Sequence, residues 1–155
     1  MWRRIQASGS FFEVLPWTDC GRTLWKAISH LEPDILTGVP PHASSRIEKY
    51  NWCTRELGIP LTHVDKAGQL FQHYQVNNSN HSQKASRVIT CWSYNKHYES
   101  GPNRVLIDDR ESLREAWEAK GGIFVHHNGD LSRTLKQLVD HGIVSRNQME
   151  QQGFM

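Results

Sequence analysis

Two adjacent carboxylates close an apolar segment in the second half of the chain. Asp108 and Asp109 follow Val105-Leu-Ile, a run typical of a strand. Two carboxylates about 4 Å apart at an effective dielectric near 20 repel each other by roughly 4 kcal/mol. Mg²⁺, which proteins often hold with one or two carboxylates together with substrate phosphate, would offset that repulsion. In the alternative, Asp109 caps the next helix and Asp108 pairs with Arg110 or Arg104.

Groups suited to phosphate binding follow two other segments with strand-like composition. Thr37 and Gly38 end the segment Asp34-Ile-Leu-Thr-Gly-Val-Pro, where a hydroxyl and unobstructed N–H groups can meet a phosphate oxygen. Lys96 follows the β-branched run Arg87-Val-Ile-Thr-Cys-Trp, and its ammonium can neutralise phosphoryl oxygens. Taken alone, Thr37 is also an ordinary strand-end threonine and Lys96 an ordinary solvated lysine. Together with the aspartates they predict a phosphate site.

Hydrophobic periodicity places these residues on alternating strands and helices. We expect strands at 34–38, 59–64, 87–92, 104–109 and 123–126, and helices at 44–57, 109–120 and 132–141. This spacing predicts parallel βαβ units and therefore an α/β fold with a doubly wound, Rossmann-like sheet. Ligands of such sheets bind outside the carboxyl ends of the strands, where the candidate residues lie.

One domain, residues 1–145, is expected to contain these elements. Residues 65–86 are polar and almost without periodicity, so we expect an exposed insertion there, and 146–155 should form a flexible tail. The net charge of +2 is too small for a composition-driven nucleic-acid binder. Since no apolar run approaches the roughly 18 residues that cross a bilayer, no membrane partner is expected.

The cysteines and the first residues bear on the compartment. Cys20, Cys53 and Cys91 form no C-x-x-C pair and are odd in number, so neither a disulfide framework nor a cysteine zinc site is indicated. Reduced thiols favour a cytoplasmic location. Residues 1–12, with two arginines and no acid, also fit a short mitochondrial presequence, which remains an alternative.

Two further candidates are weaker. His126 and His127 end a predicted strand, but neighbouring strand residues face opposite sides, so we expect packing or surface histidines rather than a shared metal site. The segment Asp19-Cys-Gly-Arg-Thr is a candidate relocated nucleophile, although Pro16-Trp17 precedes it where a buried strand is required.

On these residues the chain resembles the haloacid dehalogenase (HAD) superfamily of phosphohydrolases, particularly its small deoxyribonucleotidase-like and phage-type members. The resemblance spans roughly Phe11 to Val144 and rests on four stretches: Ile35-Leu-Thr-Gly-Val-Pro, Val88-Ile-Thr-Cys-Trp-Ser with Lys96-His97, Val105-Leu-Ile-Asp-Asp-Arg, and Gly121-Gly-Ile-Phe-Val-His-His. It implies catalytic and phosphate-binding roles for Thr37 and Lys96, and an Mg²⁺ site at Asp108 and Asp109.

The first motif of that family is absent from this sequence. In the family an apolar strand ends in Asp-x-Asp, whose first aspartate is the nucleophile, and no Asp-x-Asp occurs here. The resemblance therefore implies a phosphate-monoester hydrolase domain, with nucleotides as one substrate class, that is inactive or impaired as it stands. The alternative is a non-catalytic structural or interaction protein that uses the same scaffold to bind a protein partner.

The missing motif also removes a central strand from the expected sheet, which would leave backbone groups unpaired. The strands that carry Thr37 and Asp108 would then pair directly, or Phe11–Leu15 would fill the gap, or a second chain would supply the strand. A reading frame truncated upstream of the first motif is a further explanation.

Overall fold

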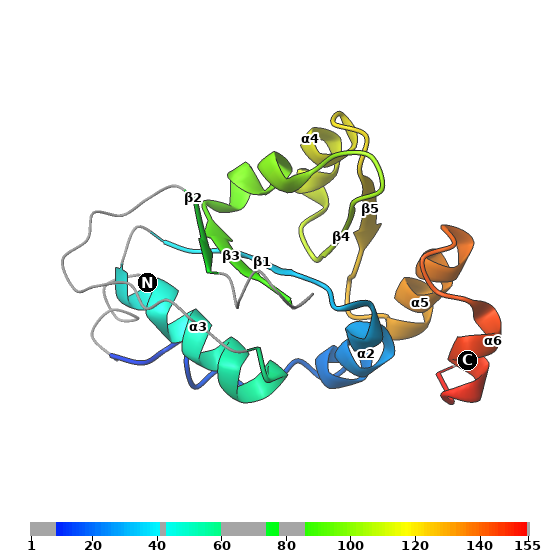
Figure 1. The fold of residues 1–155 in the computed structure, drawn as a ribbon, viewed down its shortest axis with the longest axis horizontal. Coiled ribbons are helices and arrows are strands. Elements are labelled where there is room, and N and C mark those ends of the chain that lie inside the picture. Colours follow the sequence, from blue (N-terminus) through cyan, green and yellow to red (C-terminus); the bar gives the residue numbers. More distant parts are fainter. Residues whose placement is uncertain (1–8, 41–42, 60–73, 78–85, 155) are drawn as a thin grey trace. The chain divides into compact units, whose positions relative to one another are not determined.

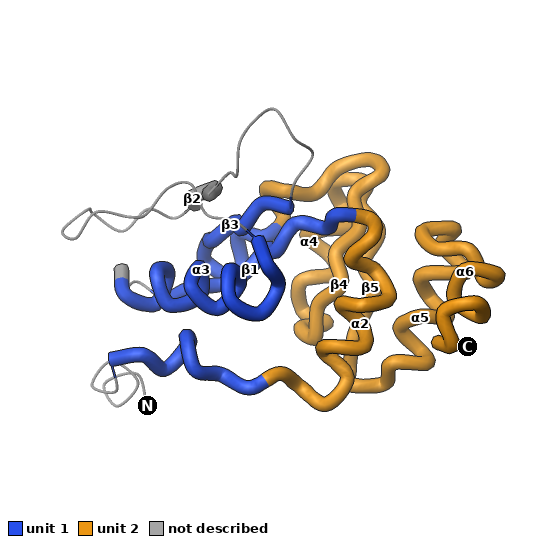
Figure 2. The backbone as a smooth tube through the Cα atoms, turned by 60° about the horizontal axis from the view of Figure 1, so that its bottom comes forward, with its two compact units in different colours: residues 1–16, 32–96 blue, residues 17–31, 97–155 orange. Residues whose placement is uncertain are grey.

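The computed structural model describes residues 9–40, 43–59, 74–77 and 86–154. Contacts within the chain divide it into two compact units (Figure 2). Unit 1 comprises residues 1–16 and 32–96, and unit 2 comprises residues 17–31 and 97–155. Each unit contains helices and parallel strands, which confirms the α/β class.

A three-stranded sheet forms the centre of unit 1 (Figure 1). Its order is β1 (Ile35–Gly38), β3 (Val88–Cys91), β2 (Tyr74–Asn77); β3 runs parallel to β1 and antiparallel to β2. All four residues of β3 are buried, as a continuous apolar and β-branched run between two neighbours requires. The register sets Thr37 opposite Thr90, so β1 and β3 end at the same edge.

Helix α3 (Ala43–Leu57) packs against β3. Arg46, Tyr50 and Cys53 are buried at three- and four-residue spacing, which defines the inward stripe of the helix. The Tyr50 hydroxyl lies 3.2 Å from the Thr90 hydroxyl and joins the helix to the middle of the sheet. Gly58, with φ of +66°, ends the helix in the left-handed conformation that glycine adopts most readily.

The segment Phe11–Leu15 lies against α3 and is not a strand. The Phe12 N–H donates to Glu48 at 2.8 Å, and Trp52 Nε1 donates to the Leu15 carbonyl at 2.8 Å. Residues 11–14 form a turn. Of the two internal ways to complete the sheet, this one is wrong.

The direct pairing of the Thr37 and Asp108 strands stays a prediction, because the two strands belong to different units. Inside unit 1, β1 pairs with β3, and inside unit 2 the strand that carries Asp108 pairs with one other strand. Completion of the sheet by a second chain also stays a prediction.

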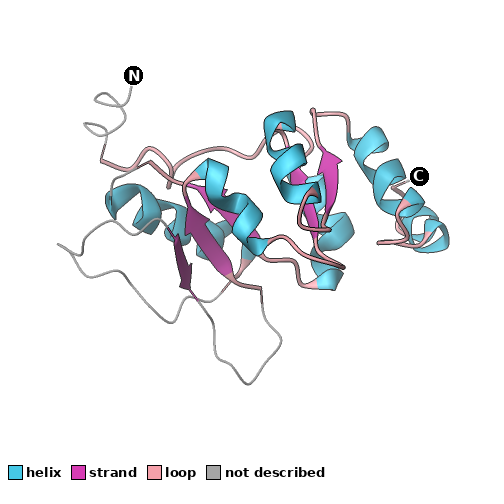
Figure 3. Cartoon of the chain, turned by 90° about the horizontal axis from the view of Figure 1, so that it is seen from above, coloured by secondary structure: helices cyan, strands magenta, loops and turns pink. Residues whose placement is uncertain are grey.

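Unit 2 is built on a parallel pair of strands, β4 (Val105–Asp108) and β5 (Ile123–His126), with Asp108 opposite His126. Its helical elements, shown in Figure 3, are α2 (Gly21–Ile28), η1 (Ser29–Leu31), η2 (Ser93–Glu99, which begins in unit 1), η3 (Glu111–Leu113), α4 (Arg114–Glu118), α5 (Leu131–Asp140) and α6 (Arg146–Gln151).

Alternation along β5 directs its side chains to different helices. Val125 is fully buried in a core with Leu135 and Leu138 of α5, together with Ala27 of α2. The preceding residue of the strand, Phe124, has its ring centroid 4.8 Å from the guanidinium carbon of Arg114 in α4. Both faces of β5 are therefore covered by helix.

The predicted strands near 34–38, 87–92, 104–109 and 123–126 and the helices near 44–57 and 132–141 are confirmed, with ends shifted by a few residues. The helix expected from 109 to 120 is shorter, because η3 precedes α4 and α4 ends at Glu118. Neither Asp109 nor Ser112 caps it; Arg110 and Leu113 occupy the two N-cap positions without side-chain bonds.

The structure contains two short elements that the sequence analysis did not predict. Residues 146–151 form α6, capped by the Ser145 hydroxyl, which accepts from the Gln148 N–H at 3.2 Å, and Met149 is fully buried. Tyr74–Asn77, inside the expected insertion, form the edge strand β2. The rest of the insertion to residue 85, residues 60–64 of the expected strand, and residues 1–8 of the presequence alternative lie outside the described residues.

Candidate functional site

A lysine of α3 contacts the carboxyl end of β1. Lys49 Nζ donates to the Thr37 hydroxyl at 2.9 Å and to the Gly38 carbonyl at 2.8 Å. Helix α3 follows β1 directly in the chain and returns along the sheet, which brings its middle back to the strand end. Two of the residues predicted to bind phosphate therefore share a cation that the sequence did not single out.

The charge on Lys49 is poorly compensated. Burial and repulsion from Lys96 lower the pKa of Lys49 from 10.5 to about 8, although Cys53 raises it by a smaller amount. The described contacts of its amine are to the two neutral oxygens and to the ring of Phe12, whose centroid lies 4.8 Å away. An anion bound here would therefore be stabilised by a cation that has lost much of its water.

Lys96 approaches the same place from β3. It lies in η2, five residues after the end of β3, and is 9% exposed. Its charge also contributes to lowering the pKa of Lys49. The structure thus brings Thr37 and Gly38 into contact with Lys49, whereas Lys96 is linked to this group only through that effect of its charge.

Gly38 is required by a close approach to η2. A Cβ placed on Gly38 would lie 2.0 Å from Ser93 Oγ and 3.3 Å from Ser93 Cα. Only a residue without a side chain fits there while the strand end keeps its distance from η2. The Ser93 hydroxyl consequently lies against the backbone at the end of β1, beside the residues that predict the site.

This group of residues can bind a phosphate but offers no obvious nucleophile. Two hydroxyls and two ammonium groups are donors matched to a phosphate dianion. The neighbouring thiols stay protonated at neutral pH, because burial raises the pKa of Cys53 to about 12 and also raises the pKa of Cys91. The arrangement therefore supports capture of an anion rather than covalent attack on it.

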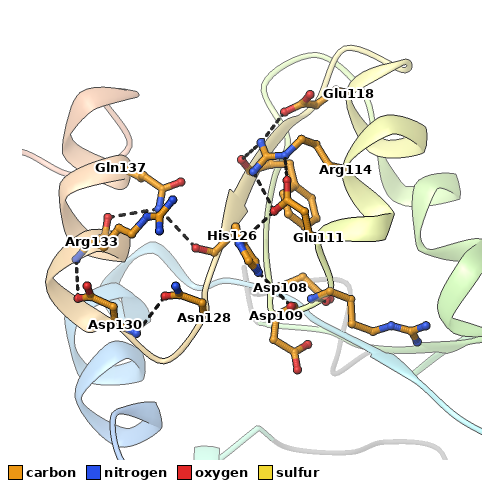
Figure 4. A network of polar contacts seen from close by, with 12 residues as sticks. Asp108, Asp109, Glu111, Arg114, Glu118, His126, Asn128, Asp130, Arg133 and Gln137 are labelled. Atoms are coloured by element: carbon orange, nitrogen blue, oxygen red, sulfur yellow. Dashed lines mark hydrogen bonds and ion pairs between the residues drawn. The ribbon is translucent and has the colours of Figure 1, made fainter.

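The predicted metal residues belong to unit 2 (Figure 4). Asp108 is 8% exposed, and its Oδ1 accepts from the Arg110 backbone N–H at 2.9 Å. Asp109 is exposed; its carboxylate points away from the neighbouring side chains, while its carbonyl lies 3.1 Å from His126 Nε2. The structural alternative is thus realised in part: Asp108 bonds to the backbone of Arg110, whereas Arg104 pairs with Glu99.

A network of opposite charges surrounds this strand end. Glu111 lies 3.0 Å from His126 Nδ1 and forms an ion pair with Arg114, which also pairs with Glu118 at 3.0 Å. The hydrogen bond from Arg114 lowers the pKa of Glu111, and the same bond raises the pKa of Arg114. The network joins η3 and α4 to β5, and Arg114 pairs with both Glu111 and Glu118.

The two aspartates fit Mg²⁺ only sparsely. Within the described residues, no group of three or more His, Cys, Asp or Glu side chains converges on one point. Mg²⁺ is often held by one or two carboxylates, with water and substrate phosphate completing its shell. Asp108 and Asp109 can provide that minimum, with the exposed Asp109 more accessible.

The sequence analysis did not identify Lys49, and it included Ser93 only as the end of the stretch Val88-Ile-Thr-Cys-Trp-Ser, without a role of its own. Lys49 is one of several polar residues on a helix of mixed composition, and only the return of α3 to β1 distinguishes it. Ser93 begins η2 directly after Trp92 and is recognisable only through its approach to Gly38. The available signal was position: both belong to elements that follow a strand end.

No family model, curated protein or solved structure matches this chain. Among the described helices, none combines the length and the apolar character needed to span a bilayer.

Proposed function

We propose that the chain is a HAD-type phosphohydrolase domain that binds phosphate monoesters, nucleotides included, but lacks the aspartyl nucleophile and is inactive or impaired as it stands. The observation that carries this proposal is the contact of Lys49 with Thr37 and Gly38, beside Lys96. These residues would receive the phosphate, and the ester group would extend toward solvent.

The electrostatics favour a doubly charged anion as the ligand. Two ammonium groups that repel each other in a desolvated place cost stability, and a dianion between them converts repulsion into attraction. The Thr37 hydroxyl, now an acceptor for Lys49, would turn its proton toward a phosphate oxygen. Binding thus offsets a cost that is built into the free protein.

Mg²⁺ is part of the proposal through Asp108 and Asp109. When bound, the ion would neutralise charge on the phosphate oxygens, and the two carboxylates would hold it at the end of β4. We propose further that the two parallel pairs belong to one doubly wound sheet whose central strand is provided by another chain.

Titration calorimetry with inorganic phosphate and with a nucleoside monophosphate tests the binding step. We expect saturable binding that is lost in Lys96→Met, while Lys136→Met, which removes an exposed lysine paired with Asp140 in unit 2, binds as the unmodified protein does. Equal weakening by both substitutions would reduce the site to general charge attraction.

A phosphatase assay with Mg²⁺ tests the metal and the chemistry. We expect turnover to be very low, and Mg²⁺ to tighten phosphate binding in the unmodified protein but not in Asp108→Asn or Asp109→Asn. Activity or Mg²⁺ dependence unchanged by both substitutions rejects the metal role.

The second candidate function is a non-catalytic interaction protein, favoured by the lack of any Asp-x-Asp in the sequence. It predicts no turnover and no phosphate affinity, with a protein partner in place of the small molecule. Absence of phosphate binding in the calorimetric experiment would favour this candidate over the first.

A further inference from the structure

A cysteine and a histidine of unit 2 lie in contact, far from each other in the sequence. Cys20 immediately precedes α2 and His127 immediately follows β5. Cys20 Sγ is 3.2 Å from His127 Nε2, closer than its other acceptor, the Gly129 carbonyl at 3.6 Å. A thiol within hydrogen-bond reach of an imidazole is the geometry of a nucleophile and its base.

A third residue fixes which nitrogen of the ring is free. The Thr134 hydroxyl donates to the Asp130 carbonyl at 2.9 Å, and since a carbonyl only accepts, the hydroxyl proton is committed there. The same hydroxyl lies 2.8 Å from His127 Nδ1, so it accepts from Nδ1–H. The lone pair of the neutral ring is therefore on Nε2, which faces the thiol.

The orienting residue is held rigidly. Thr134 is fully buried in the first turns of α5, and Asp130 caps that helix by accepting from the Arg133 N–H at 3.0 Å. Helix, cap and hydroxyl together fix the plane and the tautomer of His127. This is the arrangement in which a third group orients a catalytic base.

The thiol is also accessible, unlike the other two. Cys20 is partly exposed, so a small reagent in solution can reach it. Cys53 and Cys91 are buried. One cysteine of three therefore has both a base and a path for a small reagent.

We propose that Cys20 is a reactive thiol that takes hydroperoxides as its substrate class, with His127 as its base and Thr134 as a positioning residue. The sulfur attacks the nearer peroxide oxygen, an S–O bond forms and the O–O bond breaks. His127 Nε2 takes the thiol proton and passes it to the leaving alkoxide, which becomes an alcohol, or, with hydrogen peroxide, to the leaving hydroxide, which becomes water. Sulfur is oxidised by two electrons to the sulfenic acid, and the peroxide is reduced.

Dimedone trapping after treatment of the full chain with hydrogen peroxide, read by mass spectrometry of peptides, tests the proposal. We expect label on Cys20 well before Cys53 or Cys91, and a rate that falls at least about ten-fold in His127→Gln. Equal labelling of all three cysteines in the folded protein, or a rate unchanged by His127→Gln, overturns it.

A pair of substitutions at Thr134 separates orientation from folding. Thr134→Val keeps the shape and removes the hydroxyl, whereas Thr134→Ser keeps the hydroxyl and loses a methyl group. We expect slower trapping of Cys20 in the valine variant and a rate near that of the unmodified protein in the serine variant, with circular dichroism confirming that both are folded. Equal slowing in both variants contradicts the role of the hydroxyl.

Discussion

The ends of β1 and β4 show two outcomes of the same sequence signal, polar residues after an apolar strand. At β1, the amine of the partly buried Lys49 contacts neutral oxygens and is repelled by the charge of Lys96, so its own charge is poorly compensated. At β4, the charges of Glu111 and Arg114 are paired with each other and with neighbours. Burial without compensation indicates a place for a ligand, whereas paired charges indicate a structural joint.

Removing the charge of Lys49 should have the largest effect, on both phosphate binding and stability. We expect Lys49→Met to weaken phosphate binding about ten- to a hundred-fold, because a charge-assisted hydrogen bond is lost. The same substitution should raise the free energy of unfolding by about 1 to 3 kcal/mol at pH 7, since a partly buried and poorly compensated cation is removed. Calorimetry and denaturant unfolding measure the two effects.

Opposite signs for binding and stability are the distinguishing result. Lys136→Met, the matched control, should leave both quantities close to those of the unmodified protein. A loss of stability in Lys49→Met would mean that Lys49 supports the fold rather than a ligand.

Closing the space between β1 and η2 should have the next largest effect. Gly38→Ala places a methyl group against Ser93, whose hydroxyl must move and whose Cα is crowded, and we expect a loss of about 1 to 3 kcal/mol in denaturant unfolding. Gly58→Ala, where no atom lies within 4 Å but φ is positive, separates steric crowding from backbone strain. If Gly38→Ala unfolds at the same denaturant concentration as the unmodified protein, the close approach is not structurally required.

Raising the pH should weaken phosphate binding. As the pH passes about 8, Lys49 loses its proton in the free protein, and the affinity should fall by up to about ten-fold per pH unit. In Lys49→Met the fall near pH 8 should be absent. Calorimetry between pH 6.5 and 9.5 measures both slopes.

The same proton affects stability with the opposite sign. The folded pKa of Lys49 lies below its ordinary 10.5, so the unfolded state binds more protons between about pH 8 and 10.5. Stability due to Lys49 therefore rises over that range, as the difference between the unmodified protein and Lys49→Met will show. Taking this difference removes the contribution of the buried thiols, which titrate above pH 9.

The smallest effect on stability is expected for Glu111→Gln, which removes a paired charge near the end of β4. Glu111 is exposed, so water and salt screen its pair with Arg114. Its lowered pKa means that it contributes stability above about pH 4.5 that is lost as the pH falls further. A small difference in melting temperature at pH 7 that disappears in high salt is the expected result; one that persists in high salt would show that the pair is not screened.

The sequence predicted those elements whose composition alone determines them. The strands Val88–Cys91 and Val105–Asp108 are apolar runs that the sequence predicts directly. Thr37, Lys96 and Asp108 were identified because each lies at or shortly after the end of a predicted strand. Strand β2 and helix α6 were missed because each is polar in sequence and is fixed by a neighbour, β3 in one case and the core around Met149 in the other.

The decisive contacts of both sites join residues that periodicity treats separately. Lys49 meets Thr37 through the return of a helix, and Cys20 meets His127 from 107 positions away in the chain. Neither approach follows from composition, because it depends on how loops direct the elements. The prediction that His126 and His127 face different sides did agree with the contacts, since His126 meets Glu111 and His127 meets Thr134.

Strand β3 is hydrogen-bonded on both sides, by β1 and β2, and Thr90 at its centre is also joined to Tyr50. Its amide hydrogens should accordingly be the slowest in unit 1 to exchange with deuterium, because opening them disrupts both ladders at once. Strand β3, which pairs with the strand of Thr37, would then stay folded during the local fluctuations through which the proposed anion binds and leaves.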